Sequence, residues 1–143
     1  MRSGGLESQG LCQPSRAVLV VDGDANICRF SSVILLTQGY QVLRANDSLE
    51  AILLGAAHAA TLDLLVVDAE MPRISGPLLA QCLALFRPDL RILYTSGDYT
   101  QPTIDGVPVL RKPFDPQQLI AAAFEAPEAF PGCRAVKNGL SQR

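Results

Sequence analysis

Short apolar runs alternate with segments of helical periodicity along most of the chain. The run Ala17–Val21 is continuously apolar, is rich in β-branched residues and ends on Asp22, and the run Leu62–Val67 likewise ends on Asp68. Such runs are typical of strands buried on both faces of a sheet. Three further short runs also favour strands: 41–45, 91–95 and 107–111. The pattern therefore predicts five strands.

Helical periodicity fills most of the intervals between these strands. Capping residues, apolar spacing and stop signals predict four helices, with these limits: Asp24 to Gly39, Ser48 to Ala57, Pro77 to Phe86, and Asp115–Pro116 to Phe124. The interval between Ser96 and Val107 differs, because Pro102, Gly106 and the near absence of an apolar face favour a loop or a single turn. Strands that alternate with helices predict an α/β fold. We expect a three-layer sandwich around a five-stranded parallel sheet. In the alternation of strands and helices, the fourth helix, which would lie between the fourth and fifth strands, is shortened or missing.

Composition narrows the class of protein. The chain has 143 residues, 48% of them hydrophobic, which suits one compact domain. A formal net charge of -2 argues against a nucleic-acid-coating protein, which would be strongly basic. The apolar runs are too short to cross a bilayer, and Met1 to Arg16 contain no apolar leader. We therefore expect a soluble cytoplasmic protein that neither binds nucleic acid nor inserts into a membrane.

Gly, Pro, Ser and Gln gather at the two ends of the chain. This composition predicts a flexible N-terminal arm at residues 1–15 and a flexible C-terminal tail at residues 127–143. The predicted domain between them covers residues 16–126.

The residues that follow the predicted strands carry the chemistry. Ligands bind at the carboxyl ends of the strands in an open parallel sheet. The residues expected there are Asp22 and Asp24 after the first strand, Asp68 after the third, Thr95 and Ser96 at the fourth, and Lys112 after the fifth. Three carboxylates at one edge repel each other unless a cation lies among them, and oxygen ligands suit Mg²⁺. A hydroxyl and a lysine beside that cation are donors suited to a phosphoryl group.

Four segments follow one another along the predicted domain: Asp22-x-Asp24 behind VLVV, DLLVVDAEMPRISG (63–76), LYTSG (93–97) and RKPF (111–114). Together and in this order, they resemble the receiver domain of bacterial two-component response regulators. The resemblance runs from about Ala17 to Phe124. It implies a flavodoxin-like topology with strand order 2-1-3-4-5. It also implies a phosphorelay signalling module and not an enzyme.

The resemblance also implies roles for individual residues. Asp68 matches the phosphoacceptor, which takes a phosphoryl group from a histidine kinase or a phosphotransfer protein. Asp22 matches an acid of the Mg²⁺ site, to which Asp24 and Asp68 would contribute. Ser96, or less well Thr95, matches the hydroxyl that moves onto the acyl phosphate. Lys112 matches the lysine that pairs with the phosphate, and the bond that links it to Pro113 is often cis in the family.

The chain also departs from the family pattern. Gly23 stands where a second acid is usual, which implies weaker Mg²⁺ binding, and Asp24 can substitute only by a local shift. Val109 stands where a switching aromatic is frequent, and the stretch after the fourth strand is short.

Two other hypotheses remain open at this point. One is a degenerate receiver that binds a downstream protein without phosphorylation. The other is a haloacid-dehalogenase-type phosphatase, because VVDGD (20–24) resembles the motif of that class. Asp22 would then be the nucleophile and Asp24 the general acid and base.

Overall fold

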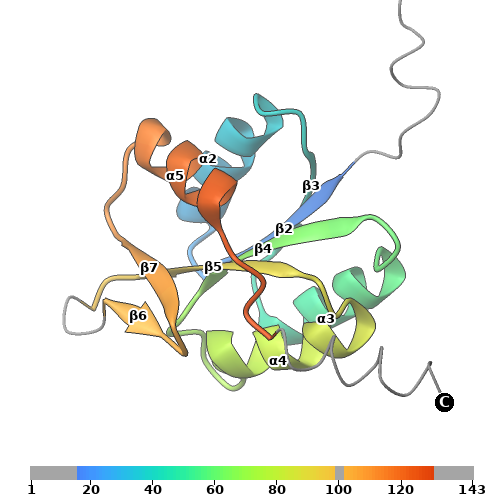
Figure 1. Ribbon diagram of the computed structural model, residues 1–143. Helices are drawn as coiled ribbons and strands as arrows, with labels where there is room; N and C mark the ends of the chain where they lie inside the picture. The colour runs from blue at the N-terminus through green and yellow to red at the C-terminus, as the bar shows by residue number, and fades with distance from the viewer. Residues whose placement is uncertain (1–15, 99–101, 131–143) are drawn as a thin grey trace, which may run out of the picture.

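The computed structural model describes residues 16–98 and 102–130, which form one mixed sheet between two layers of helices (Figure 1). The strands are β2 (Ala17–Val21), β3 (Gln41–Ala45), β4 (Leu62–Asp68), β5 (Arg91–Ser96), β6 (Thr103–Ile104) and β7 (Val107–Arg111). The helices are α2 (Ala25–Leu36), α3 (Ser48–Ala57), α4 (Gly76–Phe86) and α5 (Pro116–Glu125). Helices α2 and α5 cover one face of the sheet, and α3 and α4 cover the other.

The sheet confirms the predicted topology. Its order is β3-β2-β4-β5-β7-β6, and every neighbouring pair from β3 to β7 is parallel. Without β6, this is the expected order 2-1-3-4-5. The central strand β2 is buried along its whole length, because its alternate side chains enter two different apolar clusters. One cluster lies beneath α3 and α4, and the other beneath α2 and α5. No helix in the described part of the chain could span a membrane.

Short polar side chains begin the helices. Asp24 caps α2 by accepting hydrogen bonds from the backbone amides of Asn26 and Ile27, and Asp115 caps α5 in a reciprocal capping box. From the sequence, Ser48 is predicted to cap the second helix, and this prediction is wrong by one residue. Asp47 caps α3 instead, and Ser48 is its first helical residue, with its hydroxyl donating to the carbonyl oxygen of Ile74.

The segment before β7 corrects a second prediction. We expected a loop or a single turn between Ser96 and Val107, but Thr103–Ile104 forms β6, which pairs antiparallel with β7. Asp105 and Gly106 connect the two strands with positive φ angles of 50° and 81°. Positive φ at both central residues is what a two-residue hairpin of type I′ requires, and Asp-Gly is a preferred pair for it. Within the described residues, the sheet therefore has six strands, with β6 at its edge.

The first residues of the predicted C-terminal tail contact the core. We call residues 127–130 the C-terminal strap. The Ile92 amide donates to the Pro127 carbonyl oxygen at 2.9 Å, and Glu128 forms an isolated bridge with Arg91. Phe130 then packs against the cluster under α3 and α4, so the chain leaves α5 and crosses to the opposite face of the sheet (Figure 1). The rest of the predicted tail and the predicted arm at 1–15 lie outside the described residues.

The Arg91 side chain connects the end of α5 to the sheet. Its guanidinium donates to the carbonyl oxygens of Ala123 and Ala126 at the end of α5, and to the Tyr40 hydroxyl. It also forms an ion pair of 2.8 Å with Asp63. Burial alone would lower the pKa of Arg91, but the hydrogen bond and charge of Asp63 outweigh burial and raise it.

Candidate functional site

Four side chains predicted from the sequence meet at one edge of the sheet. Asp22 follows β2, Asp68 ends β4, Ser96 ends β5 and Lys112 follows β7. The strands are parallel and adjacent in the order β2-β4-β5-β7, so their carboxyl ends lie side by side. This edge is where an open α/β sheet binds ligands.

Lys112 links the two aspartates. Its Nζ lies 2.9 Å from Oδ2 of Asp22 and 3.1 Å from Oδ2 of Asp68. All three side chains are largely buried, and Asp22 is only 3% exposed. Burial would lower the pKa of Lys112, but the hydrogen bond that it donates to Asp22 and the charges of both aspartates raise it above its usual value. Lys112 is therefore protonated at neutral pH and balances one of the two negative charges.

The aspartates differ in what else they contact. Oδ1 of Asp22 accepts from the Asp24 amide at 2.8 Å, and Oδ1 of Asp68 accepts from the Glu70 amide at 2.9 Å. The Asp24 carboxylate instead accepts from the first amides of α2, so the structure uses it as a helix cap. Within residues 16–98 and 102–130, no three His, Cys, Asp or Glu side chains are grouped as metal ligands.

Asp22 and Asp68 nevertheless fit a magnesium ion. Mg²⁺ is commonly held by one or two carboxylates, with waters and phosphate oxygens completing its octahedron. Both carboxylates already face the same ammonium group, which shows that a positive charge between them is favourable. At Gly23, an added Cβ would meet no atom within 4 Å, so no packing reason explains why this chain has no acid there.

Ser96 and Thr95 have different surroundings. The Ser96 hydroxyl donates to Oε2 of Glu70 and accepts from the Asp98 amide at 2.9 Å. The carbonyl oxygen of Thr95 accepts from the Ala69 amide, which fixes the loop after β4 against β5. Glu70 is thus a site residue that we did not predict from the sequence. Its only signal there was its position two residues after Asp68 in the quoted segment 63–76.

The loop from Ala69 to Ser75 is folded tightly against the end of β4. A Cβ added at Gly76 would lie 2.6 Å from the carbonyl oxygen of Asp68, so only glycine allows this approach. Earlier in the loop, the Ile74 amide donates to the carbonyl oxygen of Pro72, around Arg73 with a φ of 68°. This close packing explains the glycine in the quoted segment and fixes the backbone beside Asp68.

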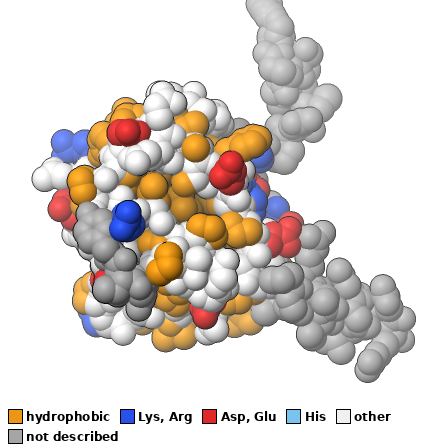
Figure 2. Space-filling view, turned by 60° about the vertical axis from the view of Figure 1, so that its left-hand side comes forward, with side chains coloured by type: hydrophobic (Ala, Val, Ile, Leu, Met, Phe, Trp, Pro, Cys, Tyr) orange, Lys and Arg blue, Asp and Glu red, His pale blue; other side chains and the backbone are white. Residues whose placement is uncertain are grey.

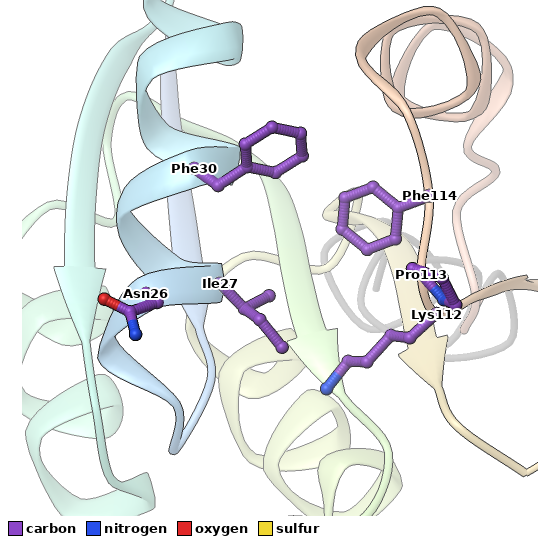
Figure 3. A pocket seen from close by; sticks show the side chains of 6 residues that line it. All are labelled: Asn26, Ile27, Phe30, Lys112, Pro113 and Phe114. Carbon is purple, nitrogen blue, oxygen red and sulfur yellow. The ribbon is translucent and has the colours of Figure 1, made fainter.

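An apolar pocket opens beside Lys112 (Figure 3). It has a volume of about 590 Å³ and is lined by residues of α2 and of the β7–α5 loop: Asn26, Ile27, Phe30, Lys112, Pro113 and Phe114. The rings of Phe30 and Phe114 lie with centroids 6.1 Å apart and planes tilted by 44°, and Lys112 runs below them. The Lys112–Pro113 bond is cis, as expected. The pocket therefore places an apolar surface next to the two aspartates.

Comparisons with known proteins agree with this arrangement. The family described as "Response regulator receiver domain" matches residues 18–124. The chain is 39% identical over 61 residues to the CAI-1 autoinducer sensor kinase/phosphatase CqsS of Vibrio cholerae, covering 43% of this chain and 9% of that protein. It is 30% identical over 118 residues to the sensor kinase CckA of Brucella abortus, covering 78% of this chain and 12% of the kinase. The chain thus spans about a tenth of the length of either relative.

A solved structure extends this comparison to the fold. The receiver domain of the hybrid histidine kinase CckA superposes with a TM-score of 0.65 at 31% identity. The match covers 73% of this chain and 93% of that one. The similarity is therefore to the receiver part of a kinase.

Proposed function

Because the chain belongs to the response regulator receiver domain family, we propose that Asp68 accepts a phosphoryl group in a two-component phosphorelay, with a histidine kinase or a phosphotransfer protein as donor. The observation that carries the proposal is the position of Lys112 between Asp22 and Asp68, at the carboxyl end of the central strands. Receiver domains are in general signalling modules and not enzymes. We place this one in the cytoplasm, and no helix among the described residues could span a membrane.

The proposed transfer forms one bond and breaks one. An Asp68 carboxylate oxygen bonds to the phosphorus of a phosphohistidine, and the N–P bond breaks with its electron pair remaining on the imidazole nitrogen. Lys112 stabilises the added negative charge, since its ammonium already lies 3.1 Å from Asp68. Asp22 and Asp68 would hold Mg²⁺, which would supply further positive charge to stabilise the phosphoryl group. The Ser96 hydroxyl then becomes a donor to one of those oxygens.

The apolar pocket beside Lys112 supports a protein as the donor. Phe30 is 43% exposed and, with Phe114, provides an aromatic surface beside the phosphoacceptor. A partner that places its phosphohistidine over Asp68 would bury this surface at the same time. Further apolar side chains, among them Val33 and Phe124, lie exposed on the same helical layer. Figure 2 shows apolar side chains exposed between sparse charged ones over one face of the molecule.

A second function has support from the same site. In a degenerate receiver, the downstream protein would bind without any phosphoryl transfer. Lys112 already balances one charge of the aspartate pair, Asp24 is used as a helix cap, and glycine at position 23 leaves out one acid. The phosphatase hypothesis is less well supported, because Asp24, its acid and base, caps α2.

Intact mass after incubation with acetyl phosphate tests the proposal. We expect the protein to gain one phosphoryl group in the presence of Mg²⁺, and to gain none after removal of Mg²⁺ or in Asp68→Asn. Asp89→Asn, which removes a carboxylate remote from the site, is the matched control and should behave like the wild type. A wild-type mass that stays unchanged, in protein folded by circular dichroism, would favour the degenerate binding module.

A further inference from the structure

Glu70 connects the loop after β4 to the end of β5. Its backbone amide donates to Oδ1 of Asp68, which fixes its main chain beside the phosphoacceptor. Its side chain then reaches across to β5, where Oε2 accepts from the Ser96 hydroxyl and Oε1 accepts from the Gly97 amide at 3.4 Å. Both carboxylate oxygens are therefore used to hold the end of the neighbouring strand.

We propose that Glu70 is a positioning residue that holds the Ser96 hydroxyl in the unphosphorylated state, and that a phosphoryl group on Asp68 takes this hydroxyl from it. The inference rests on the proposed function, because it needs Asp68 to carry the group. Neither the missing second acid at Gly23 nor the Lys112 contacts require this role. The observations that carry it are the hydrogen bonds of Glu70.

The competition for Ser96 has a physical cause. A serine hydroxyl has one proton to donate, and in the structure it goes to the Glu70 carboxylate. A phosphoryl group on Asp68 brings additional negative charge and several strong acceptor oxygens to within two residues of Glu70. The two negative groups repel each other, and Glu70 is exposed, so its side chain can move into water.

Release of Ser96 would change the chain beyond the site. The Ser96 hydroxyl accepts a hydrogen bond from the Asp98 amide. The Ser96 carbonyl oxygen accepts one from the Lys112 amide at 2.8 Å. The Gly97 amide loses its acceptor as soon as Glu70 leaves. The first residues after β5 would therefore rearrange together.

Backbone amide NMR of the full chain tests this role. We expect the Gly97 and Asp98 resonances to move when beryllium trifluoride, a reversible phosphoryl mimic, is added with Mg²⁺. In Glu70→Ala the same resonances should already be displaced in that direction without the mimic. Glu70→Gln, which keeps the shape but removes the charge, should lower the mimic concentration at half-saturation by about tenfold, equivalent to ~1.4 kcal/mol. Glu125→Gln removes an equal charge far from the site and should leave that concentration unchanged.

The outcomes separate this inference from the function on which it rests. If the protein gains a phosphoryl group but its Gly97 and Asp98 resonances stay in place, the role of Glu70 is wrong and the proposed function stands. A half-saturation in Glu70→Gln within twofold of the wild type would also overturn the role. In a Ser96→Ala background, Glu70→Ala should no longer move Asp98, and a persistent effect would mean that Glu70 acts without Ser96. A chain that takes neither the phosphoryl group nor the mimic would overturn both.

Discussion

Replacing Tyr94 by phenylalanine should make the protein more stable. Tyr94 lies in the middle of β5 with no exposed surface, and its hydroxyl is buried without a hydrogen-bond partner among the described residues. Such a group costs about 1–3 kcal/mol relative to its hydrated form. The cavity left by one oxygen atom costs only ~0.4 kcal/mol at about 24 cal/mol per Å³. We therefore expect Tyr94→Phe to raise the free energy of unfolding by about 1 kcal/mol, and Tm by about 3 °C.

Tyr40→Phe is the matched control, because the Tyr40 hydroxyl accepts from the Arg91 guanidinium at 2.9 Å. Removal of a hydroxyl that has a charged partner should lower the free energy of unfolding by about 1–2 kcal/mol. Urea unfolding followed by far-ultraviolet circular dichroism measures both variants, and an unchanged m-value shows that the same surface is exposed. A Tyr94→Phe variant that is less stable than the wild type would refute the reasoning, because the hydroxyl would then have a partner in solution.

The same side chain predicts a dependence on pH. Burial, and secondarily the charge of Asp105, raise the pKa of Tyr94 from 10.0 to about 12. A group whose folded pKa is raised contributes stability that is complete below pH 10 and is lost as the pH rises through about 12. Absorbance at alkaline pH should therefore show an ionisation near pH 12 that is missing from Tyr94→Phe. The stability of that variant should fall less steeply above pH 10, and equally steep losses in both proteins would contradict the assignment.

Three further substitutions test other parts of the structure. Arg91→Met removes the donors to the end of α5 and leaves the partly buried Asp63 with Arg16 at 3.9 Å in place of its partner at 2.8 Å, so urea unfolding should show a loss of about 2–4 kcal/mol. A loss below 1 kcal/mol would mean that the guanidinium contacts are weak in solution. Arg73→Gly relieves a positive φ of 68° and should raise stability by about 0.5–1 kcal/mol, whereas a destabilised variant would show that the arginine side chain has a stabilising contact. Gly23→Asp adds a carboxylate where nothing lies within 4 Å, and calorimetry should show Mg²⁺ binding about tenfold tighter; unchanged affinity would place the ion elsewhere.

Strand periodicity accounts for what the sequence could predict. The runs that end on Asp22 and Asp68 are apolar on both faces, which only a central parallel strand requires, and this places both acids at one edge. Ser96 and Lys112 follow by the same reasoning from β5 and β7. The structure brings these four residues together, while their roles in phosphoryl transfer stay predictions. The hairpin of β6 and β7 was also predictable in principle, because Asp105-Gly106 between short apolar segments is a turn signal.

Other features depend on contacts that no periodic pattern encodes. Glu70 is an exposed loop residue, and its direction is decided by the close approach of Gly76 to Asp68 and by the hydrogen bond from its own amide. The C-terminal strap has neither helical nor strand periodicity. It packs where β5 begins, because β7 pairs with β5 only from Tyr94 onward and leaves the Ile92 amide available to Pro127. Tertiary geometry, and not local propensity, determines both.

The strap also has a consequence for the way in which the domain opens. A helix near the end of a chain usually frays first, and its amide hydrogens exchange quickly with solvent. Here two sets of contacts must break before α5 can separate from the sheet. One is the hydrogen bond from the Ile92 amide to the Pro127 carbonyl oxygen. The other is the pair of hydrogen bonds from Arg91 to the carbonyl oxygens of Ala123 and Ala126. Opening of α5 is thereby tied to release of the strap from the first part of β5, while the pairing of β5 with β4 can stay intact. The Ile92 amide hydrogen, which the strap holds, should therefore exchange at the same rate as the amide hydrogens at the end of α5.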